Sequence, residues 1–241
     1  MKVIQPNCRI QFTAEDIDFI LGILGDEGGK SDALVRLLTD EDARDQILDD
    51  EALFRALLEH RGCLRVSHRF YFYVLVRHVL RRAGISDRSV ADYVAEVLAE
   101  FSHSERARCV VPGHRQPLDY MVDMLAALQT ADDRTRFCIH AHIGNHSLFF
   151  SGIFAERIRT RAGSRGFPGV RYYEDLGRAN YRVASDHRLA RRYDLSSIFT
   201  TLSDRFDVTR EALNELTDRL IFLGESEAAC TTLMRIDPGG N

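Results

Sequence analysis

The chain has 241 residues, of which 45% are hydrophobic and 28% are charged, and its formal net charge is −4. This many apolar side chains can offset the entropy lost on folding, which excludes a chain that is disordered throughout. The net charge gives no general attraction for nucleic acid. The longest apolar run, Phe70 to Val76, is far shorter than the roughly 20 residues of a membrane-spanning helix, so we expect no membrane segment.

Charge is distributed unevenly along the chain. Residues 15–59 contain fourteen acids against four bases, whereas residues 155–192 contain ten Arg and few acids. One interpretation is that an acidic face meets a basic face, within one chain or between subunits. The alternative is two solvated helix faces that never touch.

The cysteines and the N-terminus indicate a reduced, cytoplasmic protein. The five Cys are far apart, and no C-x-x-C pair occurs. An odd number of Cys in a chain of this length argues against a disulfide framework. The first residues lack the apolar stretch of a signal peptide.

The first part of the chain reads as a short arm followed by acidic helices. We expect residues 1–12 to be an extended arm and residues 13–60 to form an acidic helical lobe. Thr13 is the predicted N-cap of the first helix, and Thr39 with Asp42 forms a loose capping box for a later one. We expect a break in that later helix near Asp49 and Asp50.

Residues 68–80 are apolar on nearly every side, so periodicity alone does not separate helix from strand. Their aromatic and β-branched content favours a strand. Their length, the preceding Ser67, and Arg81 and Arg82 before Gly84 favour a helix, which is our prediction. Ser86 or Asp87 then begins a helix that runs to Phe101.

The rest of the chain is predicted to be helical as well. A loop over 102–117 precedes a helix that starts at Pro117. A further helix starts at Asp132 or Asp133 and runs to about Phe154, or alternatively continues past Arg157 and ends by Gly163. Residues 171–193 form the clearest amphipathic helix, with Arg178 and Arg182 opposite an apolar arc. That arc consists of Tyr172, Leu176, Ala179, Val183 and Ala190. Glu174 is the expected ion-pair partner of Arg178.

Two further helices are predicted over 195–206 and 209–223, and 225–241 is predicted to be a loose tail. These elements, about nine helices with no β-hairpin signal and no alternation of strands and helices, predict an all-α fold. We expect a single domain over 1–241, with a helical core over 64–224 built around helices 68–82 and 134–154.

The first candidate site is a cluster of histidines. His142 and His146 lie four residues apart and project from one face of a helix, the spacing of a two-His metal pair. His68 is a candidate third ligand, so a metal or haem site is one interpretation. The alternative is a set of imidazoles with ordinary hydrogen bonds, since no H-E-x-x-H motif is present.

A second candidate is a polar cleft between the two apolar helices. Arg77 and Asn145 are its candidate ligand-binding residues, and His78 and His142 are its candidate acid or base. A buried Arg needs a counter-charge, for which Asp92, Asp119 and Asp123 are candidates. The alternative is that Arg77 forms only a structural ion pair.

The third candidate is the arginine-rich segment 155–192, in which Arg178 and Arg182 are the expected binding residues. It predicts a protein partner, nucleic acid held by phosphate pairing and stacking, or a solvated face with local ion pairs. Because no catalytic motif is found, we expect a helical interaction or regulatory protein that binds a protein partner or itself. An enzyme or cofactor protein using the central His and Arg residues is the alternative.

Overall fold

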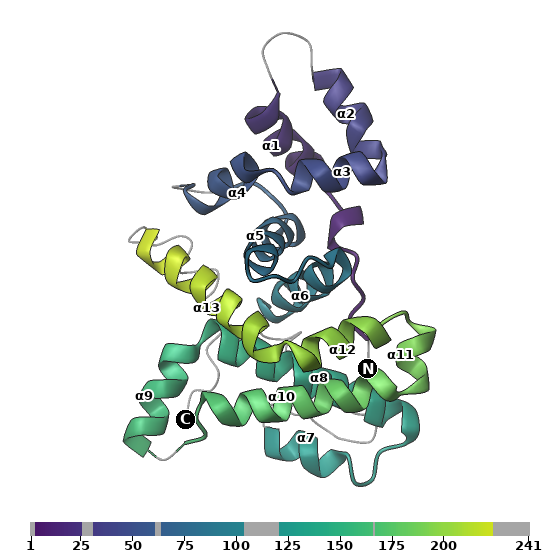
Figure 1. The fold of residues 1–241 in the computed structure, drawn as a ribbon, viewed down its shortest axis with the longest axis vertical. Coiled ribbons are helices and arrows are strands. Elements are labelled where there is room, and N and C mark those ends of the chain that lie inside the picture. The colour runs from purple at the N-terminus through teal and green to yellow at the C-terminus, as the bar shows by residue number, and fades with distance from the viewer. Residues whose placement is uncertain (1–2, 26–30, 61–63, 104–120, 166, 224–241) are drawn as a thin grey trace. The chain divides into compact units, whose positions relative to one another are not determined.

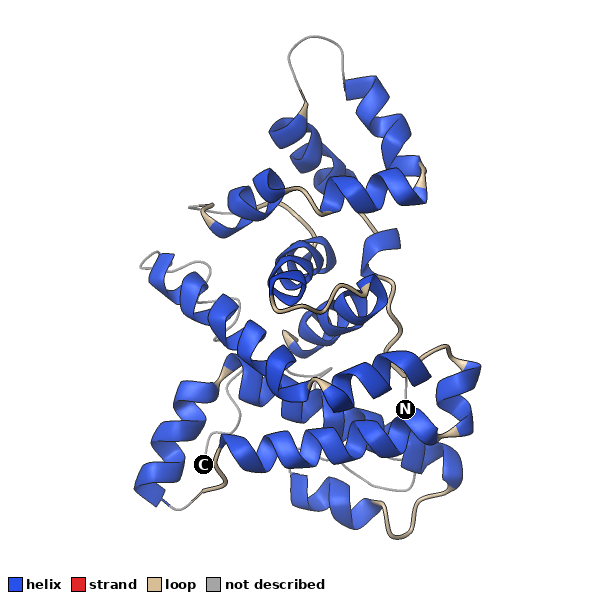
Figure 2. Cartoon of the chain, viewed as in Figure 1, coloured by secondary structure: helices blue, strands red, loops and turns tan. Residues whose placement is uncertain are grey.

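The computed structural model describes residues 3–25, 31–60, 64–103, 121–165 and 167–223. Within these ranges the chain forms thirteen α-helices and one short 3-10 helix, and no strand is present there (Figures 1 and 2). The all-α prediction is therefore confirmed. The helix count exceeds the predicted nine because several predicted helices are interrupted.

In chain order the elements are η1 Cys8–Ile10, α1 Ala14–Leu24, α2 Ser31–Thr39, α3 Glu41–Leu48, α4 Glu51–Leu58, α5 His68–Arg82, α6 Arg88–Phe101, α7 Met121–Ala127, α8 Asp133–Ile153, α9 Ala155–Arg165, α10 Val170–Asp186, α11 Arg188–Arg192, α12 Ser196–Asp204 and α13 Phe206–Leu223. The predicted helix start at Pro117, and the predicted tail over 225–241, lie outside the described residues.

The chain divides into two compact units. Of the described residues, unit 1 comprises 3–5, 100–103, 121–165 and 167–217, and unit 2 comprises 6–25, 31–60, 64–99 and 218–223. Helix α5 belongs to unit 2 and α8 to unit 1. The arrangement of a single domain around these two helices stays a prediction, and each unit is described by itself.

Local capping signals set the helix starts of unit 2. Thr13 and Asp16 form a reciprocal capping box at α1, and the Ser67 side chain accepts a hydrogen bond from the backbone of Phe70 at α5. The predicted capping box of Thr39 with Asp42 is wrong. Asp40 caps α3 instead, and the Thr39 hydroxyl donates to the carbonyl of Arg36. The predicted break near Asp49 is confirmed, since α3 ends at Leu48 and Asp50 caps α4.

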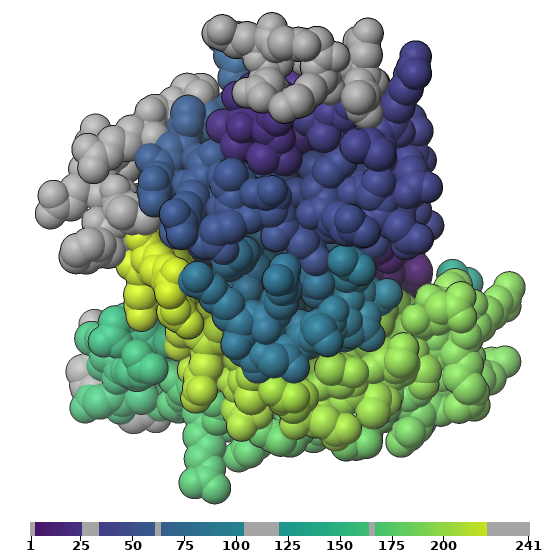
Figure 3. Space-filling view, turned by 45° about the horizontal axis from the view of Figure 1, so that its top comes forward, coloured from purple at the N-terminus to yellow at the C-terminus, as the bar shows by residue number. Residues whose placement is uncertain are grey.

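Helix α5 is buried on almost every side, as its sequence predicts. Nine of its residues are buried: Phe70, Phe72, Tyr73, Val74, Leu75, Val76, Arg77, Val79 and Leu80. In the space-filling view, the purple and dark-blue atoms of the first helices lie against the lighter blue atoms of α5 and α6 (Figure 3). Unit 2 thus packs short acidic helices on one strongly apolar helix.

In unit 1, Asp132 caps α8 by accepting from the backbone of Thr135. The predicted end of this helix near Phe154 is confirmed, because Phe154 leaves the helical conformation and α9 starts afresh at Ala155. The alternative of one continuous helix past Arg157 is wrong. Asn214 of α13 donates its side-chain amide to the carbonyls of Ser151 and Gly152. These bonds satisfy carbonyls that the helix end leaves open. Helix α9 also runs through Gly163, the predicted stop.

The predicted helix 171–193 is divided at His187. This residue is extended (φ −71°, ψ 142°), and its Nδ1 accepts from the backbone of Leu189, so it caps α11. Sequence reasoning missed the break because His is not among the common N-cap residues. The next two helices begin at Ser196 and Phe206, so the predicted start of the last one at residue 209 lies three residues late.

The orientation of α10 is the largest departure from the sequence prediction. Helix α10 packs on α8 mainly through Gly177 and Tyr181, and Leu176 is the member of the predicted apolar arc that takes part in this contact. A Cβ atom at Gly177 would lie 2.3 Å from a ring carbon of Phe206 and 2.9 Å from Cβ of Ser147. A Cβ atom at Gly144 of α8 would lie 2.7 Å from the ring of Tyr181. Two glycines therefore permit a helix contact that most side chains would block.

Candidate functional site

Arg77 lies at the centre of a buried ion-pair network in unit 2. It is 4% exposed, its Nε and Nη2 donate to the two carboxylate oxygens of Asp49 at 2.7 and 3.0 Å, and its Nη1 donates to the carbonyl of Ser86 at 2.7 Å. All three nitrogens are thus engaged within the protein. Asp49 takes the role proposed for Asp92 or Asp123, so these two candidates are wrong. The third candidate, Asp119, lies outside the described residues.

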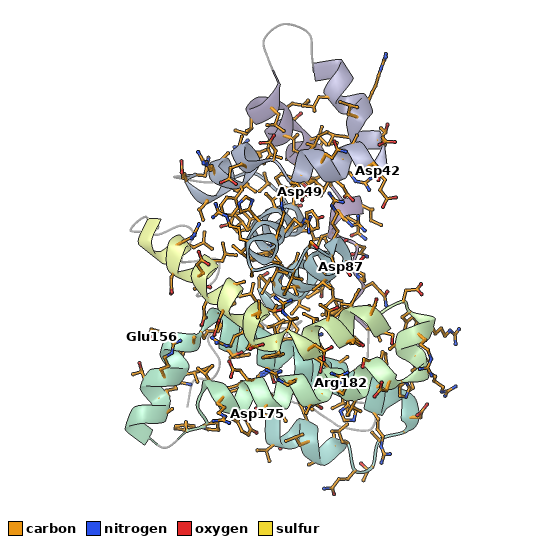
Figure 4. The ribbon with its side chains drawn as sticks, viewed as in Figure 1. Asp42, Asp49, Asp87, Glu156, Asp175 and Arg182 are labelled. Atoms are coloured by element: carbon orange, nitrogen blue, oxygen red, sulfur yellow. The ribbon has the colours of Figure 1, made fainter. Side chains whose placement is uncertain are left out.

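Asp49 also pairs with a second arginine, Arg88. Arg88 donates to its Oδ2 at 2.9 Å (Asp49 is labelled in Figure 4). Burial opposes ionisation, but the hydrogen bonds and charges of Arg77 and Arg88 outweigh it and lower the pKa of Asp49. The role of Arg77 as an anion-binding residue stays a prediction that gains no support from this placement.

A second part of the same network ties the N-terminal arm to α6. The carboxylate of Asp92 accepts from the backbone N–H of Cys8 at 2.6 Å and from Nε of Arg9 at 3.1 Å. Arg9 also donates to Asp45 at 2.8 Å. Burial raises the pKa of Asp92 to about 6 despite these donors. Sequence reasoning missed this cluster, because its members lie up to 84 positions apart in the chain and share no motif.

Glu96 completes the network one turn along α6. Arg69 binds both of its carboxylate oxygens, and the Cys8 thiol donates to Oε2 at 3.1 Å. Burial and the neighbouring Glu96 raise the pKa of Cys8, so this thiol is not a reactive thiolate. Tyr73 hydroxyl and Asp45 Oδ1 are buried close to this network without a hydrogen-bond partner among the described atoms.

These pairs account for part of the uneven charge pattern. Asp45 and Asp49, two acids of the predicted acidic lobe, are paired with Arg9, Arg77 and Arg88 of their own unit. Part of the acidic excess therefore serves internal ion pairing in unit 2. The interpretation in which an acidic face meets a basic face stays a prediction.

His78 is half-buried beside Phe54 and Glu51. Its ring stacks on Phe54 with centroids 3.8 Å apart, and its Nε2 lies 2.8 Å from Glu51 Oε2, at ion-pair distance but not aligned as a hydrogen bond. Burial lowers the pKa of His78 although Glu51 opposes this. A role of His78 in acid–base chemistry stays a prediction.

The histidines of α8 do not form a metal centre with other described residues. His142 and His146 are neighbours, with ring centroids 6.5 Å apart, and His146 stacks on Phe150. In the described part of the chain no group of three His, Cys, Asp or Glu side chains is placed to hold a metal ion. His68 is the exposed first residue of α5 and belongs to unit 2.

The environment of His146 keeps its ring neutral. The residue is half-buried, and its Nδ1 is buried and has no hydrogen-bond partner among the described atoms. Burial, helped by the neighbouring His142, lowers the pKa of His146 to about 3. A metal or haem role for His142 and His146 stays a prediction.

Asn145 takes part in a neutral polar contact between α8 and α10. It is 3% exposed and accepts from the hydroxyl of Tyr181 at 2.8 Å. One turn earlier, His140 Nδ1 lies 2.7 Å from Asn180 Oδ1, and the Asn180 amide donates to the carbonyl of Leu176. Asn145 thus joins two helices, and its predicted ligand role gains no support.

Because α10 packs through Gly177 and Tyr181, its predicted apolar arc faces outward in part. Tyr172 is 39% exposed and Val183 49% exposed, and Ala179 between them is exposed too. Leu176 packs partly against the cluster of Met124 and Ile143. Three of the five members of the arc are therefore exposed, whereas Ala190 is buried.

Charged residues run beside these three apolar residues on α10. Arg178 lies 3.6 Å from Asp207, Arg182 pairs with Asp204, and Arg171 lies 3.9 Å from Asp175. Figure 4 places Asp175 and Arg182 along this one helix. The predicted pair of Glu174 with Arg178 is wrong, because Glu174 binds the buried Arg210 at 2.6 Å. We call the eight exposed residues the α10 outer face: Arg171, Tyr172, Asp175, Arg178, Ala179, Arg182, Val183 and Asp186.

Other arginines of segment 155–192 are also paired locally. Arg159 lies 3.1 Å from Glu156, and Arg188 lies 2.8 Å from Asp133. Each of these two arginines therefore has a carboxylate beside it.

Comparisons with known proteins give no information about function. No protein-family model, no curated protein and no solved structure matches this chain. Among the described helices, none is both long enough and apolar enough to cross a bilayer.

Proposed function

We propose that this chain is a cytoplasmic, helical interaction protein and that the α10 outer face is its docking surface. One observation carries the proposal. Tyr172, Ala179 and Val183 form an apolar row on a surface helix, and unit 1 leaves that row exposed. Exposed apolar rows that are rimmed by charged side chains are typical of protein-binding sites.

The surroundings of the row support a protein partner over nucleic acid. Arg178 and Arg182 are half-exposed and already have carboxylate neighbours, Asp207 and Asp204. Phosphate binding relies on arginines whose charge is not locally cancelled. Nucleic-acid binding through 155–192 is thus the weaker candidate, and a salt-dependent gel shift at low salt would favour it.

The cytoplasmic assignment rests on the cysteines. The thiols of Cys8 and Cys138 are free and buried in the described structure. Free, unpaired thiols agree with a reducing compartment.

A matched pair of variants tests the proposal. Val183 is 49% exposed on the α10 outer face, and Val35 is 40% exposed on α2. A photoreactive residue at position 183 should give one discrete cross-linked species, identified by mass spectrometry, whereas the same residue at 35 should not. Equal labelling from both positions, or none from either, would contradict the proposal.

A further inference from the structure

The α10 outer face carries a charge order that is complementary to itself. Placed at about 100° per residue, its charged members and its apolar members occupy two adjacent strips of one arc. The charged strip contains both signs: Arg171, Asp175, Arg178, Arg182 and Asp186. A surface that carries both signs in a fixed order can pair with a copy of itself.

The order fits an antiparallel pair of α10 helices. A two-fold axis placed between Arg178 and Ala179 sets Asp175 opposite Arg182 of the second copy. The same axis sets Arg171 opposite Asp186 of the second copy. Because an isologous contact repeats each pairing, four opposite-charge pairs form around one axis. The two Arg178 side chains meet across this axis, about 1.5 Å apart along the helix direction, and each has its own counter-charge in Asp207 at 3.6 Å.

The apolar strip agrees with the same axis. Ala179 lies next to it, and its small side chain lets the two helices approach closely. Tyr172 then falls within roughly 3 Å, along the helix axis, of Val183 of the second copy, at 1.5 Å rise per residue. Their exposed side chains, 39% and 49% in the single chain, would cover each other.

The competing contacts within the chain are weak. Arg171 and Asp175 lie 3.9 Å apart with side chains 92% and 73% exposed, which is an ion pair of small value. Arg182 is half-exposed and can keep Asp204 while it meets a second carboxylate. Little is lost, therefore, when these side chains face a second copy.

We propose that the partner of the α10 outer face is a second copy of this chain, bound in an antiparallel two-fold dimer. The inference rests on the proposed function, since it names the occupant of the same docking surface. The α10 outer face offers eight exposed residues, fewer than the roughly 20–30 residues a side of a standard interface. The dimer is therefore weak and depends on protein concentration.

Two charge-reversed chains test the pairing. In a dimer of the Asp175→Arg variant, positions 175 and 182 of both copies are basic. In a dimer of the Arg182→Asp variant, the same four positions are acidic. Neither variant should therefore pair with itself. Mixed one to one, the two variants restore both pairs and should form a heterodimer. By sedimentation velocity we expect each variant alone to dimerise at least about tenfold more weakly than the natural chain. The mixture should recover to within about threefold.

A second pair of charge-reversed variants keeps the test valid if a variant of the first pair does not fold. Arg171→Asp and Asp186→Arg reverse the other predicted pair, and Arg171 is almost fully exposed. This couple should behave in the same way, alone and mixed. Glu156→Arg, at an exposed site on α9, is the control and should leave dimerisation unchanged.

The outcomes separate the two proposals. A natural chain that is monomeric at all concentrations, or variants whose mixture gains nothing over either chain alone, overturns the self-association. If position 183 then still cross-links to a different protein, the docking surface stands and only its occupant was wrong. If position 183 cross-links to nothing, both proposals fail.

Discussion

The polar side chains buried in unit 2 differ from those buried between α8 and α10 of unit 1. In unit 2 several are charged and held in Arg–carboxylate pairs, among them Arg77 with Asp49. Between α8 and α10 of unit 1 they are neutral, as in the contact of Tyr181 with Asn145. The charged network should be sensitive to loss of a partner. The contact between α8 and α10 should be sensitive to side-chain size, because Gly144 leaves room for the ring of Tyr181 and Gly177 for the ring of Phe206.

Removing a buried charge should have the largest effect. Arg77→Met leaves Asp49 with only Arg88 and the more distant Arg81 for compensation. We expect the free energy of unfolding to fall by about 2–4 kcal/mol, measured by urea titration. Arg55→Met is the control, because Arg55 is 66% exposed in its pair with Glu51 and should cost under about 1 kcal/mol. Equal losses for the two variants would contradict the network.

Adding one methyl group should break the helix contact in unit 1. Gly177→Ala places Cβ against Phe206 and Ser147, so it should cost about 1–3 kcal/mol even though Ala favours helices. Gly163→Ala on α9 meets no atom within 4 Å and should be neutral or stabilise by up to about 1 kcal/mol. Thermal unfolding compares the two. A stabilising Gly177→Ala would show that α10 does not pack through this glycine.

Low pH should lower the free energy of unfolding through protonation of His146. Its folded pKa, about 3, lies below the unfolded value of about 6.5, so the stability it supports is present above pH 6.5 and is lost as the pH falls toward 3. From pH 7 to pH 5 we expect a loss of about 1–2 kcal/mol. His146→Phe should remove that loss, whereas His60→Phe, at an exposed site, should retain it. Identical pH dependence in both variants would exclude His146 as the source.

Asp92 should change the free energy of unfolding with pH in the direction opposite to His146. Because its folded pKa of about 6 lies above the unfolded value of about 3.9, its contribution is present below pH 3.9 and is lost as the pH rises through 6. Asp92→Asn should therefore make the acid loss steeper. The pH dependence of the urea midpoint measures both effects.

A single neutral hydrogen bond should have the smallest effect. Tyr181→Phe removes the donor to Asn145 and should cost about 1 kcal/mol, with little dependence on salt. Tyr172→Phe on the exposed side of the same helix should cost close to nothing. If Tyr172→Phe proves the more costly, the orientation of α10 is reversed.

Local signals predicted much of the fold. Thr13, Ser67 and Asp132 were recognised as helix starts because their side chains bond backbone groups only a few residues away. The helical state of 68–82 followed from its length and flanking residues. Capping needs no knowledge of the rest of the chain, and this is why it was predictable.

Long-range contacts were not predictable in the same way. The partner of Arg77 lies 28 positions away, and no periodic pattern singles out Asp49. For α10, hydrophobicity favoured burial of Val183, but the contact with α8 uses Gly177 and the ring of Tyr181. A rule that scores apolar side chains does not register the close approach that a glycine allows.

The orientation of α10 supports both proposals, and cysteine accessibility measures it directly. Val183 is 49% exposed and its neighbour Ala184 only 1% exposed. In a chain whose Cys63, Cys109 and Cys230 are replaced by Ser, Val183→Cys should react with a thiol reagent at nearly the rate of an unfolded peptide in dilute solution. Ala184→Cys should react only on unfolding. Rapid labelling at 184 and protection at 183 would contradict the docking surface.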